Sequence, residues 1–221
     1  MTEADDPYCL HEGEAGELLR GHPWKRFAVI GDSVAQGAGD PVPGYSDLPW
    51  CDRIAGELRV HQPEMVYLNL GVADARAADV LAAQLEPALA FGPDLAIVVC
   101  GGNDAMRSSY DPQAVNEILE KLVTALQGVG TDVVTVSMFD ITQAPNFPEK
   151  LLKHARPRML RLSAETAELA KRLGTIHVHC NGHPAESDPD VYSADGIHAT
   201  MRVHQICAAL AIRRLGIYLR R

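Results

Sequence analysis

Short apolar runs alternate with helical patterns along most of the chain, and this alternation strongly restricts the fold. The runs are RFAVIGD, MVYLNLG, LAIVVCGG, DVVTVSMFD and TIHVHCN. Each has the length and the valine and isoleucine content of a buried strand. Because strands that alternate with helices are joined by right-handed crossovers, we predict an α/β fold with one parallel sheet covered by helices on both faces.

The helical segments carry their own start and stop signals. Asp111 can cap a helix that has Pro112 at its first position. The inward stripe of that helix is predicted to be Ile118, Leu119, Leu122, Val123 and Leu126. A second stripe begins at Met159 and ends before Gly174, a usual C-terminal stop. The last helix is expected at about residues 199 to 215.

Length and composition favour a single domain. The chain has 221 residues, of which 47% are hydrophobic, and this suits one compact core. Residues 1–24 are polar and interrupted by proline, so we expect an N-terminal arm or a loosely docked helix before a domain at 25–221. We assign no chemistry to this arm.

The charge balance and the cysteines limit the partners. The net charge of −9 disfavours binding to nucleic acid or to an anionic membrane. The acidic start lacks the features of a secretory signal, and no apolar stretch is long enough to span a membrane, so we expect a cytoplasmic protein. Five cysteines without a C-x-x-C pair predict free thiols. Oligomeric state is left open.

Ser33 follows the first predicted strand. In a parallel sheet the carboxyl ends of the strands meet at one edge, where ligands bind. A serine at this place is either the N-cap of the next helix or a nucleophile, and by itself the position favours the cap. A nucleophilic serine also needs a base, a group that orients the base, and donors for an oxyanion.

Other polar clusters supply these groups. Asp195 and His198 are separated by two residues before the last helix, so the carboxylate can accept from imidazole Nδ1, and Gly196 permits the bend. Asn103 follows the third strand and Asn69 ends the second. Each cluster alone is equally explained by a turn, but together at one sheet edge they predict a site.

Four blocks of the sequence resemble those of the SGNH, or GDSL, hydrolases. They are GDS at 31–33, NLG at 69–71, GGND at 101–104 and DGIH at 195–198. The resemblance implies a three-layer α/β/α fold like flavodoxin, with a five-stranded parallel sheet and esterase or acylhydrolase activity. It implies Ser33 as nucleophile, His198 as general base and Asp195 as its orienting group, with no cofactor. The segment PGYSDLPWCDRIAGEL is also similar to small actinobacterial-type members.

The same resemblance implies an oxyanion hole made by the backbone N–H of Ser33, a backbone N–H of the second block and the side chain of Asn103. The second-block donor is usually a glycine five residues after the asparagine, and here Asp74 stands there. A carboxylate about 5 Å from the oxyanion would cost about 3 kcal/mol at an effective dielectric near 20. We expect Asp74 to cap a helix beginning near Ala75; the alternatives are pairing with Arg76 or contact with the substrate.

Further residues are assigned less specific roles. Asp32, Gly71 and Trp50 are predicted to contact substrate, with Tyr45 and Met106 as weaker candidates. His204 is expected at the surface, and Arg107 in a solvated loop. A metal site at His177, His179 and His183 is disfavoured, because no carboxylate-rich partner set is evident.

The resulting prediction is a serine esterase or acylhydrolase that cleaves a small ester through an acyl-enzyme. The alternatives are an acyltransferase with the same triad and a protein that binds an ester or sugar without turnover. The intact set of Ser33, Asn103, Asp195 and His198 argues against the second alternative.

Overall fold

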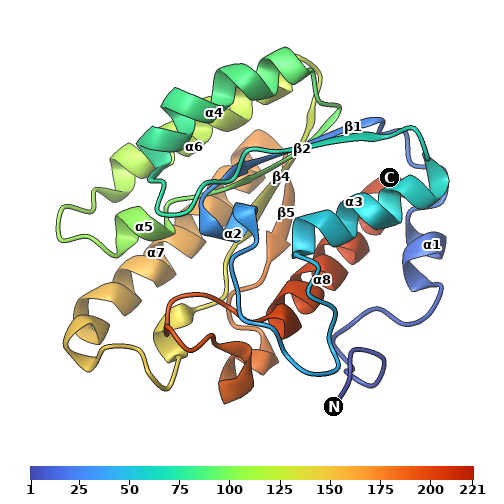
Figure 1. Cartoon of the computed structure of the whole chain (residues 1–221). Coiled ribbons are helices and arrows are strands. Elements are labelled where there is room, and N and C mark those ends of the chain that lie inside the picture. The colour runs from blue at the N-terminus through green and yellow to red at the C-terminus, as the bar shows by residue number, and fades with distance from the viewer.

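The computed structural model describes residues 1–221 and contains one five-stranded parallel sheet (Figure 1). The strand order is β2-β1-β3-β4-β5. The strands are β1 (Arg26–Gly31), β2 (Val66–Asn69), β3 (Leu95–Val99), β4 (Asp132–Ser137) and β5 (Ile176–His179). All five coincide with the predicted apolar runs, and the predicted α/β class is confirmed.

Helices cover both faces of the sheet, as Figure 1 shows for α3 and α8 on one side and α4 and α6 on the other. One layer contains α1 (Glu14–Leu18), α3 (Trp50–His61) and α8 (Met201–Leu219). The other layer contains α4 (Ala77–Phe91), α6 (Pro112–Gln127) and α7 (Glu149–Leu173). The remaining helices are short: α2 (Ser33–Gln36), α5 (Gly102–Ala105), η1 (Ile141–Gln143), η2 (Pro184–Ser187) and η3 (Pro189–Val191).

The two halves of the core follow from the alternation of side chains along each strand. In β1, Phe27 and Val29 pack into the layer of α3 and α8. Ala28 and Ile30 of the same strand pack into the layer of α4, α6 and α7. Because both faces are covered, the central strand β3 is apolar and buried throughout, and β1 is buried from Phe27 onward.

The helix boundary signals were largely correct. The Asp111 side chain accepts hydrogen bonds from the N–H groups of Gln113 and Ala114 at the start of α6. α7 ends at Leu173, and Gly174 follows in the left-handed conformation with φ of 68°. The last helix begins two residues later than predicted and continues to Leu219.

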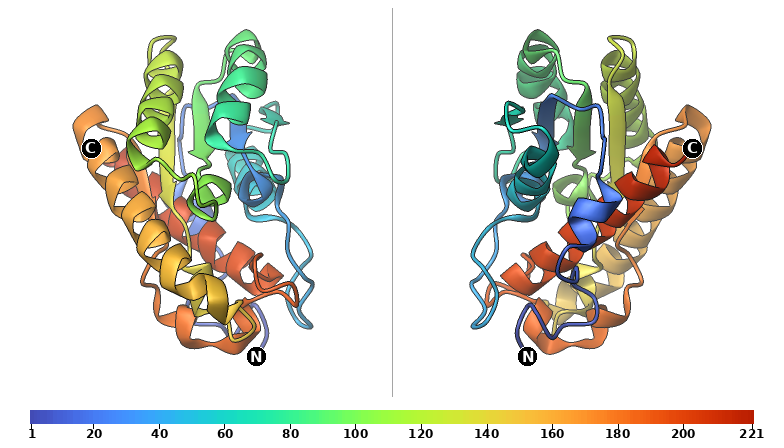
Figure 2. Two further views of the ribbon diagram at one scale, coloured as in Figure 1. Left: turned by 90° about the vertical axis from the view of Figure 1, so that its left-hand side faces the viewer. Right: turned by 90° about the vertical axis from the view of Figure 1, so that its right-hand side faces the viewer.

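Residues 1–24 are packed against the domain rather than loosely ordered. α1 lies against α8 (Figure 2), and Cys9, Leu19 and Trp24 are buried in the layer of α3 and α8. The carboxylate of Asp6 accepts a hydrogen bond from Arg202 at 2.7 Å. Its pKa is lowered, because hydrogen bonds led by the Arg202 guanidinium outweigh the opposing effect of burial. The arm therefore belongs to the folded core.

All five cysteines are free thiols. None of the helices combines the length and apolar composition needed to cross a lipid bilayer.

Candidate active site

Ser33 begins α2, immediately beyond the carboxyl end of β1. Asp32 is the N-cap of this helix, and its side chain accepts from the N–H of Val34 at 3.0 Å. Gly31 precedes them with φ of 155°, and a Cβ built there would lie 2.0 Å from the carbonyl oxygen of Val99. Only glycine therefore allows β1 to approach β3 this closely while the chain turns into α2.

The short helix α2 is fixed by side chains from two other elements. A four-residue helix leaves several carbonyl groups without partners in the helix. The indole N–H of Trp50 donates to the Val34 carbonyl at 2.8 Å, and the amide of Asn69 donates to the Ala35 carbonyl at 2.8 Å. These bonds hold the helix that carries Ser33, so Trp50 has a positioning contact as well as a place at the cavity.

His198 and Asp195 meet in the loop before α8, as their spacing predicts. The Nδ1 atom of His198 lies 2.6 Å from Oδ2 of Asp195, and Gly196 makes the bend with φ of 67°. Oδ1 of Asp195 accepts from the N–H groups of Ile197 and His198, each at 2.9 Å. Burial opposes ionisation, but these hydrogen bonds outweigh it and lower the pKa of Asp195 to about 2. The ionised carboxylate keeps the ring proton on Nδ1 and leaves Nε2 free as a base.

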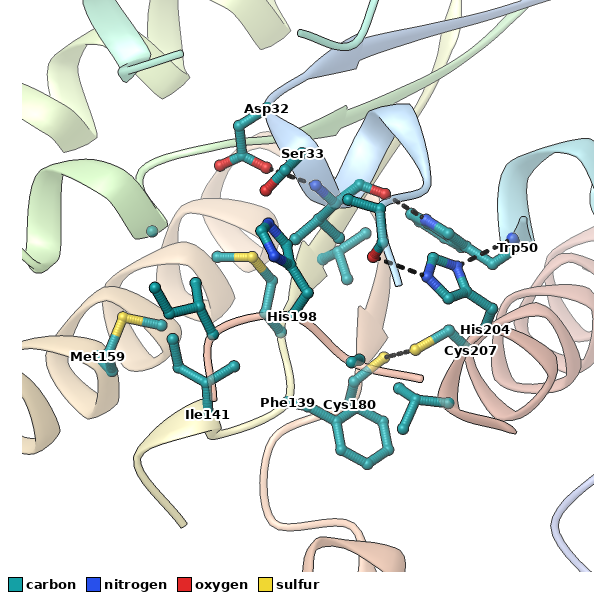
Figure 3. A pocket seen from close by; sticks show the side chains of 18 of the residues that line it. Asp32, Ser33, Trp50, Phe139, Ile141, Met159, Cys180, His198, His204 and Cys207 are labelled. Atoms are coloured by element: carbon teal, nitrogen blue, oxygen red, sulfur yellow. Dashed lines mark hydrogen bonds between the residues drawn. The ribbon is translucent and has the colours of Figure 1, made fainter. Parts of the chain in front are cut away.

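Ser33, His198 and Asn103 line one cavity of about 90 Å³, together with Asp32 and Trp50. Figure 3 shows the Ser33 hydroxyl and the His198 ring turned into the same part of this cavity. The two side chains are not hydrogen-bonded to each other, and a closer approach would be needed for a proton to pass between them. Most of the remaining wall is apolar and contains Val136, Met138, Phe139, Ile141, Met159, Cys180 and Cys207.

Asp32 adds a buried carboxyl group beside the serine. Its side chain is closed off from solvent, with 2% of the residue exposed. Burial raises its pKa from 3.8 to about 7, and the negative charge of Asp104 adds to this effect. The carboxyl group is therefore largely protonated below neutral pH, where it places little negative charge beside a developing oxyanion.

The candidate oxyanion donors lie at the ends of β1, β2 and β3. The side-chain amide of Asn103, in α5, donates one N–H to the carbonyl of Ala75 at 3.0 Å and retains a second N–H. The N–H of Gly71 already donates to Oδ1 of Asn69 at 2.9 Å. Gly71 does not line the cavity, and a Cβ there would lie 2.4 Å from the backbone nitrogen of Gln36. Its predicted substrate contact is replaced by close packing against α2.

The expectation that Asp74 caps the next helix is wrong. α4 begins at Ala77 with Arg76 as its N-cap, so Asp74 lies too early in the chain. The guanidinium group of Arg76 pairs with Asp79 instead. Asp74 is exposed and has φ of 62°, the one positive φ outside glycine. This left-handed conformation favours glycine and tolerates aspartate. It explains why glycine is usual at this position in the hydrolases that the sequence resembles and why aspartate can replace it.

Sequence reasoning also misplaced His204, which is only 5% exposed and lines the cavity. Its Nδ1 accepts from the N–H of Trp50 at 3.3 Å, so its Nε2 donates to the carbonyl of Ala38 at 3.2 Å. Burial lowers its pKa to about 4. The residues next to His204 in the sequence do not indicate these contacts, because both partners lie far away in the chain.

Gln84 of α4 was missed altogether. Its amide pairs with Gly31 in both directions, accepting from the N–H at 2.8 Å and donating to the carbonyl at 2.9 Å. It therefore fixes the end of β1 next to Ser33. An isolated glutamine on an apolar helix face was the signal available in the sequence.

Among the residues that the sequence analysis named with less specific roles, Met106 lines the cavity, whereas Tyr45, Arg107, His177, His179 and His183 do not. The Tyr45 hydroxyl donates to Asp6, and His183 caps η2. His177 is hydrogen-bonded to Thr135 and Ser137, and it belongs to no cluster of three or more side chains that could hold a metal ion.

Comparison with known proteins identifies the family. The GDSL-like lipase/acylhydrolase family matches residues 29–206, a span that contains Ser33, Asn103, Asp195 and His198. The chain belongs to this family. It is thus a GDSL-type carboxylic ester hydrolase, as the four blocks predict. A search of curated protein sequences found no match.

Solved structures share the fold of this GDSL hydrolase. An α/β hydrolase enzyme from the metagenome of Lake Arreo, Spain, is 21% identical with a TM-score of 0.68, over 87% of this chain and 95% of the other. The acetylxylan esterase Axe2 of Geobacillus stearothermophilus is 18% identical with a TM-score of 0.68, over 87% of this chain and 94% of the other.

Proposed function

We propose that this GDSL hydrolase is a serine esterase that cleaves a small ester through an acyl-enzyme on Ser33. The observation that carries the proposal is the 2.6 Å bond between Asp195 and His198, which leaves Nε2 free in the cavity that Ser33 also lines. Two variants of the Axe2 esterase, one with a serine and one with an aspartate replaced by alanine, are described as catalytic mutants, and they lend support.

Acylation begins when the Ser33 oxygen attacks the ester carbonyl and its proton passes to Nε2 of His198. The oxyanion accepts hydrogen bonds from the N–H groups of Ser33 and Asp74 and from the Asn103 amide. The tetrahedral intermediate collapses, and His198 returns the proton to the departing alcohol. Water then loses a proton to His198 and attacks the acyl-enzyme carbonyl. As the ester bond to Ser33 breaks and the acid leaves, His198 returns this proton to the Ser33 oxygen, which regenerates both residues.

The cavity indicates the kind of ester. The cavity of about 90 Å³ has room for several water molecules, each of which needs about 10–15 Å³. An acyl group of several carbons therefore fits. The apolar wall favours an acyl group without charge. The substrate we propose is a small-molecule ester with a short, uncharged acyl group.

Nitrophenyl esters of increasing acyl length test this function, with Ser33→Ala and His198→Ala as controls. A fluorophosphonate should add its mass to Ser33 in the wild-type protein and not in Ser33→Ala. We expect wild-type turnover and a loss of at least about a thousandfold in each variant. Turnover that survives in Ser33→Ala, or no labelling of wild-type protein, would contradict the proposal.

A further inference from the structure

Two adjacent residues of α5 are hydrogen-bonded to the segment that leads into α4. The side-chain amide of Asn103 donates to the carbonyl of Ala75 at 3.0 Å. The carboxylate of Asp104 accepts from the N–H of Ala77 at 2.9 Å. The proposed mechanism uses Asn103 at the oxyanion, whereas it gives Asp104 no part.

The bond from Ala77 to Asp104 is unusual because a helix normally receives its cap from its own preceding residue. Ala77 is the first residue of α4, and the N–H groups of a first turn lack partners within the helix. Its N-cap is Arg76, whose guanidinium group has no acceptor atom and is paired with Asp79. The first N–H of α4 is therefore satisfied by a carboxylate from another part of the chain.

This connection fixes the position of Asp74 relative to Asn103. The segment is held on its other side by the N–H of Val72, which donates to the carbonyl of Gly31 at 3.2 Å, next to Ser33. Between these attachments the chain turns through Asp74 in the left-handed conformation. The proposed backbone donor thus lies on a short arc anchored at one end to β1 and at the other to α5.

We infer that Asp104 is a positioning residue, which sets the distance between the backbone donor at Asp74 and the side-chain donor of Asn103. The inference rests on the proposed function. Because an error of about 1 Å in a catalytic group can cost about a hundredfold in rate, loss of this anchor should lower kcat with little change in KM.

Asp104→Ala removes the acceptor and should lower kcat by about ten- to a hundredfold. Asp104→Asn keeps an oxygen that accepts from Ala77, and Asn and Asp are comparable caps, so it should retain kcat within about threefold. Affinity for a boronic acid, which forms a tetrahedral adduct with a serine, should fall with kcat in Asp104→Ala and recover in Asp104→Asn.

Asp79→Ala is the matched control. Asp79 also accepts from an N–H at the start of α4, that of Arg76 at 3.0 Å, but it is exposed and has no bond to α5. Its replacement should lower the melting temperature, as loss of a cap does, and leave kcat within about twofold. Equal losses of kcat in Asp79→Ala and Asp104→Ala would overturn the inference, because fraying of α4 would then suffice.

Hydrogen exchange tests whether the bond from Ala77 to Asp104 holds residues 72–76 in place, independently of the esterase reaction. Amide exchange across residues 72–76 should accelerate in Asp104→Ala but neither in Asp104→Asn nor in Asp79→Ala. Faster exchange with unchanged kcat, in a protein whose turnover still requires Ser33, would overturn the positioning role and leave the esterase intact. Absence of wild-type turnover would refute the proposed function and with it the positioning role, even if the exchange result showed the anchor. An Asp104→Asn variant as slow as Asp104→Ala would also overturn it.

Discussion

Asp32→Asn should change the pH dependence of stability in a direction set by burial. The carboxyl group of Asp32 is almost completely buried, and its pKa in the folded protein is raised from 3.8 to about 7. Between these values the folded state binds more protons than the unfolded state, so stability falls as pH rises. The favourable contribution is complete below about pH 4 and is lost as pH rises through about 7.

The size of this effect follows from the same two values. At about 1.4 kcal/mol per pKa unit, the difference between 3.8 and about 7 corresponds to about 4 kcal/mol between acid and alkaline pH. Asparagine retains an oxygen to accept from Val34 but cannot ionise. The free energy of unfolding of Asp32→Asn relative to wild type should therefore rise by up to about 4 kcal/mol from pH 4 to pH 9.

Urea unfolding of both proteins across this pH range provides the measurement. Asp79→Asn is a control of opposite sign, because the pKa of Asp79 is lowered, chiefly by its hydrogen bonds with Arg76. Its stabilising contribution is present above the unfolded pKa of the carboxyl group and is lost in acid. If the difference in unfolding free energy between Asp32→Asn and wild type were constant over the whole pH range, the pKa of Asp32 would not be raised in the folded protein.

Three further substitutions test separate parts of the site. Asp195→Ala should lower kcat by about 10²- to 10⁴-fold in the nitrophenyl ester assay, because His198 loses its orienting group; an unchanged kcat would contradict that role. Asp74→Gly should raise kcat, by about tenfold at low salt and less at high salt, since an exposed carboxylate near an oxyanion is screened by ions; no rise at any ionic strength would show that Asp74 does not oppose catalysis. Cys207→Phe should reduce kcat/KM for a hexanoate ester by about tenfold more than for an acetate ester, because the larger side chain occupies part of the cavity. Ile217→Phe, on the exposed face of α8, should change kcat/KM for neither ester. Equal effects of Cys207→Phe on both esters would mean that the acyl group lies elsewhere.

Local patterns predicted the features of this protein that depend on neighbouring residues in the chain. The five strands follow from runs such as LAIVVCGG, and α6 begins at Pro112, directly after the predicted cap Asp111. The pairing of Asp195 with His198 follows from their spacing and from Gly196 between them. In each case the residues that form the structure lie within a few positions of one another.

Contacts between distant segments could not be predicted in the same way. Asp74 has the residue type of a cap, but the backbone turns through the left-handed conformation there and α4 starts later. His204 lies near the buried start of α8, where Trp50 at the start of α3 and Ala38 in the loop before it are hydrogen-bonded to its ring. The sequence of the N-terminal arm is polar, which by itself predicts loose packing. Its charged groups instead pair with those of α8, as Asp6 does with Arg202.

In the proposed mechanism, Ser33, His198 and Asn103 act on one reacting carbonyl group. The most direct test is a crystal structure of the protein after reaction with a fluorophosphonate. We expect phosphorus bonded to Ser33, Nε2 of His198 about 3 Å from a phosphonate oxygen, and the Asn103 amide about 3 Å from the phosphoryl oxygen. An adduct on another residue, or one on Ser33 with both groups far beyond hydrogen-bond distance, would contradict it.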